Sequence, residues 1–133
     1  MGTLDAIGIA GSGMGVYQTW LNAISDNLAN VNTVRATSEE AFRARYVVAS
    51  SVDYGKPAGT KVSSIELGSA EGRLVYEPTN TLADADGYVR YPDIDMSSQM
   101  TELIMAQRGY QANAAVVDRA KEAYQAALQI GRS

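Results

Sequence analysis

Residues 96–130 read MSSQMTELIMAQRGYQANAAVVDRAKEAYQAALQI, and this stretch decides how the rest of the chain must fold. Its apolar and small residues recur at alternating steps of three and four, which is the spacing of one face of an α-helix. They are Met96, Met100, Leu103, Ala106, Tyr110, Ala114, Val117, Ala120, Tyr124 and Leu128. Five of them, beginning at Met96 and ending at Tyr124, are seven apart, so the stripe has the heptad form of a coiled-coil seam. A helix of about 35 residues is roughly 50 Å long and needs a packing partner along its whole length.

The N-terminal segment supplies a partner of the same kind. One series of residues spaced by seven is Ile7, Met14, Leu21 and Leu28, and a second is Ala10, Tyr17, Ile24 and Val31. The two series interleave as the a and d positions of a heptad seam over residues 5–31. We therefore predict an α+β chain in which long N- and C-terminal helices pair as a coiled-coil-like unit. The same pair can serve as a building block for larger helical packing.

Thirteen seam residues are expected to make the contacts between the helices and between subunits. They are Ile7, Met14, Tyr17, Leu21, Ile24, Leu28, Val31, Met100, Leu103, Tyr110, Val117, Tyr124 and Leu128.

The segment between the helices changes character. Residues 34–45 have no clear period and form a loop, which is either mobile or docked on a neighbour. Short β-branched and aromatic runs follow at 46–50, 61–67, 73–77 and 88–91, separated by turn residues. They predict an antiparallel β insert of two to four strands that rests against the base of the helical pair. The expected units are an N-terminal helix (1–33), a loop (34–45), a β insert (46–92) and a C-terminal helix (93–133), with Asp93 or Asp95 capping the last helix.

Composition excludes several functions. The 11 basic and 15 acidic residues give a net charge of -4, which argues against nucleic acid as the main partner. The chain contains no cysteine and no histidine, so the commonest metal ligands and the commonest general base are absent. We predict no catalytic residue, no metal site and no cofactor. No apolar run is long enough to span a membrane, and the acidic Asp5 ahead of periodic apolar positions is unlike a cleavable signal peptide.

Two motifs suggest ligand sites, and each has a plainer interpretation. Gly11, Gly13 and Gly15 give G-x-G-x-G, whereas the dinucleotide fingerprint is G-x-G-x-x-G, and the heptad runs through them. These glycines indicate close helix packing, or a helix end that orders only on binding. The segment 84–87 (DADG) resembles the start of a calcium loop but has no glutamate in register, so a turn is favoured.

The first helix ends in NLANVNT (27–33). Its asparagines Asn27, Asn30 and Asn32 suit a helix end, because they bond nearby backbone groups and tolerate the left-handed conformation. Together with Asn113 they are candidates for polar contacts that fix helix ends or register, the alternative being simple caps and surface amides.

Three segments carry a resemblance to a known family. NLANVNT after an N-terminal helix resembles the signature of bacterial flagellar axial proteins, the rod and hook group. Val75–Pro78, Leu82–Asp84 and Gly87–Pro92 are similar to the region before the last helix in the FlgC family of flagellar basal-body rod proteins. Tyr110-Gln111-Ala112-Asn113 is similar to the C-terminal motif of that family, which adds Gln111 to the polar motif residues. The resemblance covers nearly the whole chain.

The resemblance implies a structural subunit of the proximal rod, the part of the flagellar drive shaft in the periplasmic or cell-wall space. It implies polymerisation through the terminal helices and export through the flagellar type III apparatus without signal cleavage. The implied partners are further copies of the chain, the rod proteins FlgB and FlgF, and a rod base component like FliE, with no nucleic acid and no membrane insertion.

Two functions of other classes compete with this one. A soluble coiled-coil adaptor or secretion-linked chaperone would have long amphipathic helices but no need of a turn-rich β insert, and it would form a defined oligomer. An enzyme would have to rely on carboxylates such as Asp84, Asp86, Asp93 and Asp95. Without histidine it ranks last.

Overall fold

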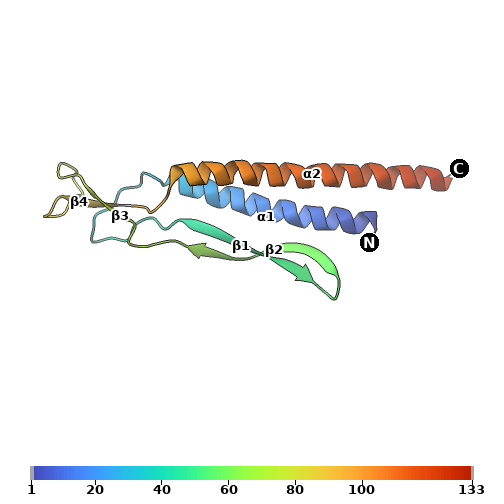
Figure 1. Ribbon diagram of the computed structural model, residues 1–133, viewed down its shortest axis with the longest axis horizontal. Coiled ribbons are helices and arrows are strands. Elements are labelled where there is room, and N and C mark those ends of the chain that lie inside the picture. Colours follow the sequence, from blue (N-terminus) through green and yellow to red (C-terminus); the bar gives the residue numbers. More distant parts are fainter. Residues whose placement is uncertain (1, 133) are drawn as a thin grey trace.

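The computed structural model describes residues 2–132 as two long helices and two β-hairpins (Figure 1). In chain order the elements are α1 (Thr3–Ala29), β1 (Arg45–Asp53), β2 (Pro57–Leu67), β3 (Arg73–Tyr76), β4 (Tyr88–Tyr91) and α2 (Met96–Arg132). The helices lie side by side and run antiparallel, and α2 extends past the start of α1. The predicted α+β class, with paired terminal helices and antiparallel strands between them, is confirmed.

Helix α2 begins at a cap formed by Asp95, one of the two candidates predicted. Its carboxylate accepts the backbone N–H of Ser97 at 3.1 Å and the hydroxyl of Ser98 at 2.9 Å. The backbone carbonyl of Asp95 accepts the N–H of Gln99 at 3.0 Å. An aspartate at this position satisfies free N–H groups and places negative charge at the positive end of the helix dipole.

Asn30 caps the C-terminal end of helix α1 through the hydrogen bonding to nearby backbone that was predicted for the asparagines. The Asn30 amide nitrogen donates to the carbonyl of Asp26 at 2.8 Å, and its oxygen accepts the hydroxyl of Thr33 at 3.1 Å. Among the described residues, only glycines have positive φ, and Asn30 has φ -109°. Asn30 therefore caps the helix through side-chain hydrogen bonds and does not adopt the left-handed conformation that asparagine tolerates.

The hairpin β1–β2 is longer than predicted and lies along α1 rather than at the base of the helices (Figure 1). Strand β2 begins at Pro57, which can open a strand because its missing N–H is needed least there. The turn therefore shrinks to the residues around Gly55, whose φ of 84° suits glycine. On the helix side, the N–H of Thr60 donates to the Ser12 hydroxyl at 3.0 Å. This contact ties the hairpin to the middle of α1.

The second hairpin, β3–β4, forms a separate sheet beyond the end of the helix pair (Figure 1). The loop 34–45 docks on its own chain, through backbone bonds in both directions between Arg35 and Arg90 at 2.9 and 2.8 Å. The Arg90 guanidinium also donates to the carbonyls of Thr37 and Glu71. The loop is thus fastened to β4 of its own chain.

The tightest packing lies at the junction of α1, this loop and the start of α2. Val31, Ala44 and Ile94 form a buried cluster with Phe42 packed against it. Ile24 retains 1% of its accessible surface. In contrast, residues 121–132 of α2 are all exposed. Neither α1 nor α2 has an apolar stretch capable of crossing a bilayer.

Candidate assembly interface

The two helices meet along a seam that relies on glycine at two points. The ring of Tyr17 lies directly over Gly109 of α2, where any Cβ would collide with the ring atoms. Asn113 of α2 lies over Gly13 of α1, where a Cβ would be 2.9 Å from the Asn113 Oδ1 atom. Because glycine lacks a side chain, each helix accepts a bulky group from the other and the backbones approach closely.

The predicted seam residues differ in how far the single chain buries them. Ile24 and Val31 are buried. Eight others are partly buried: Ile7, Met14, Tyr17, Leu21, Leu28, Leu103, Tyr110 and Val117. Three are exposed on α2, namely Met100 (46%), Tyr124 (39%) and Leu128 (48%). The role of these thirteen residues in subunit contacts stays a prediction.

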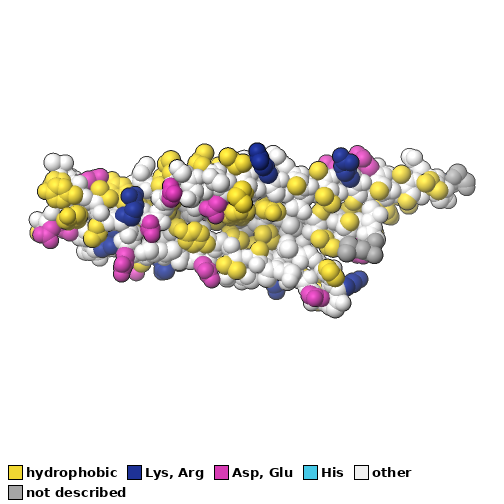
Figure 2. All heavy atoms as spheres, viewed as in Figure 1, with side chains coloured by type: hydrophobic (Ala, Val, Ile, Leu, Met, Phe, Trp, Pro, Cys, Tyr) yellow, Lys and Arg dark blue, Asp and Glu magenta, His cyan; other side chains and the backbone are white. Residues whose placement is uncertain are grey.

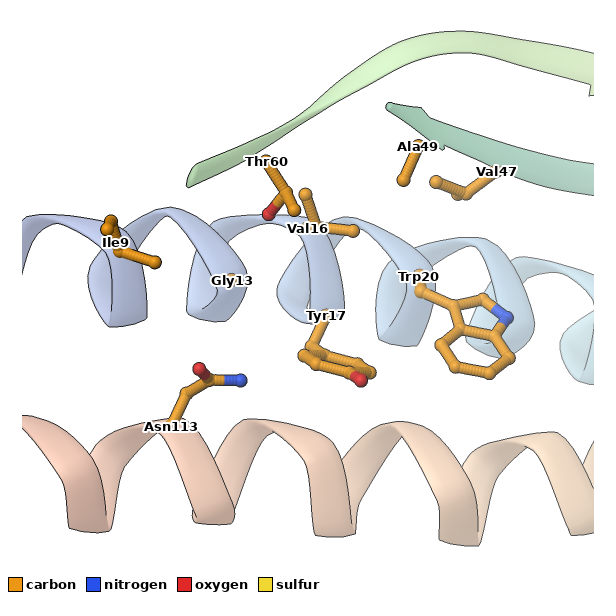
Figure 3. Close-up of a pocket in the computed structure, with 9 residues that line it drawn as sticks. All are labelled: Ile9, Gly13, Val16, Tyr17, Trp20, Val47, Ala49, Thr60 and Asn113. Carbon is orange, nitrogen blue, oxygen red and sulfur yellow. The ribbon is translucent and has the colours of Figure 1, made fainter. Parts of the chain in front are cut away.

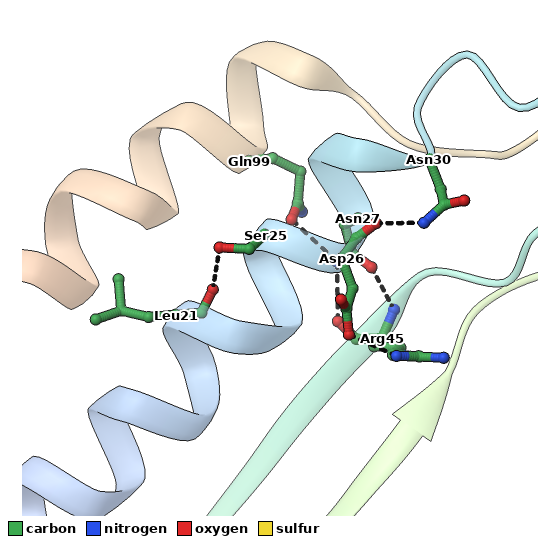
Figure 4. Close-up of polar contacts among 7 residues, drawn as sticks. All are labelled: Leu21, Ser25, Asp26, Asn27, Asn30, Arg45 and Gln99. Carbon is green, nitrogen blue, oxygen red and sulfur yellow. Dashed lines mark hydrogen bonds and ion pairs between the residues drawn. The ribbon is translucent and has the colours of Figure 1, made fainter.

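Asn27 is the polar centre of the junction (Figure 4). It is 1% exposed. Its amide nitrogen donates to the Arg45 carbonyl and to Oε1 of Gln99, both at 3.0 Å. Its amide oxygen accepts the Arg45 backbone N–H at 2.8 Å. One side chain therefore links α1, the first residue of β1 and the first turn of α2, and a shift of either neighbour would leave buried polar groups without partners.

Gln99 is the partner of Asn27 that sequence reasoning missed. It is 5% exposed, and its amide nitrogen donates to Glu102 at 2.8 Å. Its spacing offered a signal, because Gln99, Ala106, Asn113 and Ala120 are seven apart and form a second heptad series on α2. Ala106 of this series has no accessible surface. A polar residue in such a seam is a known means of fixing register.

The other polar motif residues have more local surroundings. Asn113 is partly buried, and its amide donates to the Gly109 carbonyl at 3.0 Å. Asn32 and Gln111 are exposed. The structure thus brings Asn27 together with Gln99, and places Asn113 opposite Gly13, but leaves Asn32 and Gln111 on the surface.

Next to Asn27, Asp26 and Arg45 form an ion pair that the sequence did not predict. The Arg45 Nη1 atom lies 2.5 Å from the Asp26 carboxylate, and both side chains are about half exposed at 45% and 50%. The Arg45 guanidinium also lies 5.8 Å from the centre of the Phe42 ring. An exposed pair of this kind contributes little to stability, so Asn27 rather than Asp26 determines how this end of the hairpin is held.

The glycines at positions 8–15 lie inside the continuous helix α1. A phosphate-binding loop needs a strand, a turn and a helix start, and this segment has none of them. The close-packing interpretation holds for Gly13 alone. A Cβ at Gly8, Gly11 or Gly15 would meet no atom within 4 Å.

Gly11→Ala is expected to raise the free energy of unfolding by about 1 kcal/mol, because interior glycine weakens a helix by that amount relative to alanine and the new Cβ has open space. Gly13→Ala is the matched control. Its Cβ would force the Asn113 side chain to move, so the gain should be smaller or reversed. Denaturant titration of both variants measures the difference, and equal gains would show that the contact at Gly13 has no importance.

Asp84 organises the turn that was compared with a calcium loop. Its carboxylate accepts the backbone N–H groups of Asp86 at 3.0 Å and Tyr88 at 2.9 Å, and the hydroxyl of Thr37 at 2.9 Å. The bonds from Tyr88 and then Thr37 hold the pKa of Asp84 below its ordinary value of 3.8. Gly87, with φ 88°, completes the turn. Within residues 2–132, no group of three or more acidic side chains is arranged to hold a metal ion.

Asp84→Asn is expected to lower stability at neutral pH and to matter less in acid. A carboxylate whose folded pKa is depressed stabilises the fold above its unfolded pKa, and this contribution disappears as the pH falls through the folded pKa. Urea unfolding midpoints across a pH series, with Asp86→Asn as the control for lost charge, measure the effect. If the difference in unfolding midpoint between Asp84→Asn and the wild type did not change with pH, the prediction would be contradicted.

A groove of about 510 Å³ runs along α1 between the β1–β2 hairpin and α2 (Figure 3). We call it the α1 groove. It is lined by Ile9, Gly13, Val16, Tyr17, Trp20, Val47, Ala49, Thr60 and Asn113. None of these residues is charged. A second cleft shares Ile9 with the groove and contains Asp5 and Lys56. The lining favours an apolar partner over a charged ligand.

The comparisons with known proteins match this architecture. A family model described as "Flagella basal body rod protein" matches residues 7–37, and one described as "Flagellar basal body rod FlgEFG protein C-terminal" matches residues 85–130. These two ranges contain most of α1 and α2. Neither includes residues 38–84, which carry β1, β2 and β3.

Relatives that match over nearly their whole length identify the family more precisely. The flagellar basal-body rod protein FlgC of Salmonella typhimurium is 36% identical over 134 residues, covering 99% of this chain and 100% of the relative. The protein of the same name from Escherichia coli O157:H7 is 35% identical with the same coverage, and that of Bacillus subtilis is 27% identical over 150 residues. The chain therefore belongs to the FlgC family of flagellar basal-body rod proteins, and it is a structural subunit of the rod and not an enzyme.

Proposed function

We propose that this chain polymerises through its terminal helices in the proximal rod and there helps to build the torque-transmitting shaft. The support comes from α2, which leaves large apolar residues exposed on the side away from α1. Among them are Met100, Ile104 (48%), Met105 (55%) and Val116 (47%). Apolar side chains that recur along a helix outside its own hairpin indicate a surface that other helices cover.

The partners that fit this role are further copies of the chain and neighbouring rod proteins such as FlgB, FlgF and a FliE-like base component. A second apolar surface is available for them at the far end of the molecule (Figure 2). There Tyr76 and Tyr88 form an edge-to-face pair with centroids 5.4 Å apart, and Leu74 and Leu82 are exposed nearby. Two separate apolar surfaces suit a subunit that binds more than one neighbour.

In this proposal the helices 1–33 and 93–133 form the axial part of the subunit, and residues 46–92 form an outer insert joined by the loop 34–45. The thirteen seam residues make the helix and subunit contacts. The chain travels through the flagellar type III export apparatus without signal cleavage and assembles in the periplasmic or cell-wall space. Its helices bury apolar surface on assembly, which favours the assembled state over the free subunit.

A mass-spectrometric inventory of detergent- and salt-washed basal bodies from the source cell tests the proposal. We expect the chain to stay with the washed rod at a fixed ratio to the other rod proteins. Recovery of the chain in the soluble fraction, with the rod intact, would contradict assembly in the rod and favour a soluble adaptor or a secretion-linked chaperone.

A further inference from the structure

The last twelve described residues of α2, 121–132, extend past the start of α1, and we call them the C-terminal tail (Figure 1). Every residue of the tail is exposed, although Tyr124 and Leu128 lie on one apolar face. The only charged residues in the tail are Lys121, Glu122 and Arg132. A helix end with one unpacked apolar face gains little stability by itself, so this face is suited to a partner.

The tail continues the seam that already joins α1 and α2. Val117 and Ala120 are partly buried positions of that seam. Tyr124 follows Val117 by seven residues and Leu128 follows Ala120 by eight, so both stay on the same side of the helix. Helix α1 begins at Thr3, and the tail therefore continues an established helix contact into a region where its own chain supplies no helix.

The α1 groove matches the tail in length and chemistry. The tail is about 18 Å long at 1.5 Å per residue, and the part of α1 that lines the groove, between Ile9 and Trp20, is about 16 Å long. The groove lining carries no charge. On the tail, Tyr124 and Leu128 form the apolar centre of the face, and Lys121 and Arg132 lie at its two ends. The Tyr17 and Trp20 rings, with centroids 6.1 Å apart, offer aromatic surface of the kind that dominates binding energy at interfaces.

We propose that the C-terminal tail of one copy docks in the α1 groove of a second copy, with Tyr124 and Leu128 facing the groove. The tail extends past the start of α1 (Figure 1), whereas the groove is lined by α1 residues between Ile9 and Trp20, so the tail of a chain does not reach its own groove. This inference rests on the proposed self-assembly. It makes the contact heterologous, head to tail, which is the type of contact that builds an open filament.

Because the chain has no native cysteine, disulfide trapping can test the docking without background. One purified variant carries Leu128→Cys and a second, of different mass, carries Ala49→Cys in the groove wall. They are mixed at high concentration and oxidised. Each chain has a single thiol, so every cross-link joins two copies. The matched control replaces Leu128→Cys by Ala126→Cys, which lies two residues away on the opposite face of the tail.

We expect Leu128→Cys to form the mixed disulfide with Ala49→Cys at least about tenfold faster than Ala126→Cys does, since a helix turned by roughly 200° points its thiol away from the groove. Equal rates for the two tail positions would overturn the inference. So would a preference of Leu128→Cys for Leu82→Cys, since Leu82 lies outside the groove.

Sedimentation of the same mixtures separates this inference from the proposed function. Self-association without the groove cross-link contradicts the tail docking and leaves polymerisation standing. No self-association at any concentration contradicts the docking, and the basal-body inventory then decides the proposed function independently. In the cysteine-free protein, Leu128→Ser should weaken self-association about tenfold or more, whereas Ala126→Ser should leave it nearly unchanged.

Discussion

Asn27→Leu is expected to lower the free energy of unfolding by about 3 kcal/mol, corresponding to a fall in Tm of roughly 10 °C. The substitution removes both hydrogen bonds donated to the Arg45 carbonyl and Gln99, and the bond accepted from the Arg45 N–H. These partners lie at a buried junction, so water cannot readily replace the lost amide. Leucine has as many side-chain heavy atoms as asparagine and leaves no cavity, so the loss of stability comes from the unpaired polar groups together with some overpacking by the larger methyl groups. Thermal and denaturant unfolding measure it.

Two further variants make this prediction specific. Asn32→Leu changes an exposed asparagine three residues past the end of α1 and should shift the free energy of unfolding by less than about 0.5 kcal/mol. The double variant Asn27→Leu with Gln99→Leu removes both polar partners between the helices, and it should recover part of the loss. If Asn32→Leu cost as much as Asn27→Leu, the junction would have no special role.

Gly109→Val is expected to destabilise the helix pair by about 3 kcal/mol or more, because overpacking and a β-branched residue inside a helix both oppose it. The new side chain would occupy the space of the Tyr17 ring. Tyr17 is held between α2 and Trp20, whose ring it stacks on, so it has little freedom to turn aside. Circular dichroism during thermal unfolding reports the loss. The amount of the variant recovered in washed basal bodies should fall together with its stability.

The matched background for this variant is Tyr17→Ala, which removes the ring from the position above Gly109. In the Tyr17→Ala background, Gly109→Val should lower the free energy of unfolding by less than half as much as it does in the wild type, because valine no longer collides with the tyrosine ring. Gly131→Val gives a second comparison, because a Cβ at that position meets no atom within 4 Å. If Gly109→Val in the wild type, Gly109→Val in the Tyr17→Ala background and Gly131→Val all lowered the free energy of unfolding equally, the low helix propensity of valine alone would explain the effect.

The two helices were predictable because the residue pattern that specifies a helix lies within a short stretch of sequence. Apolar residues three and four positions apart lie within about one turn of a helix and define its apolar stripe. The heptads over 5–31 and 96–130 correctly predicted α1 and α2 to within a few residues. The same reasoning predicted Asp93 or Asp95 as the cap, since an aspartate before a periodic stretch is a local signal, and the structure shows Asp95. The four strands were located correctly, but the ends of β1 and β2 were not. Their turn is shorter than the glycine and proline residues suggested.

The position of the first hairpin was not predictable from the same patterns. Alternation along β1 and β2 indicates that one face is covered, but it does not name the covering element. The structure places α1 there, with Ser12 bonded to Thr60. The distance in sequence is 48 residues, beyond the reach of any local rule. The expectation that these strands rest at the base of the helices was wrong for this reason.

Residue spacing and type along the chain were enough to predict that two long helices pair, that strands lie between them, and that motifs near both ends resemble a rod family. These properties depend on spacing and residue type along the chain. Three features become visible only in the folded chain: Gln99 is the partner of Asn27, Gly109 makes room for Tyr17, and the end of α2 extends past the start of α1. Each of these depends on the register of two segments separated by many residues. That register is set by packing and hydrogen bonding in three dimensions, which no single stretch of sequence contains.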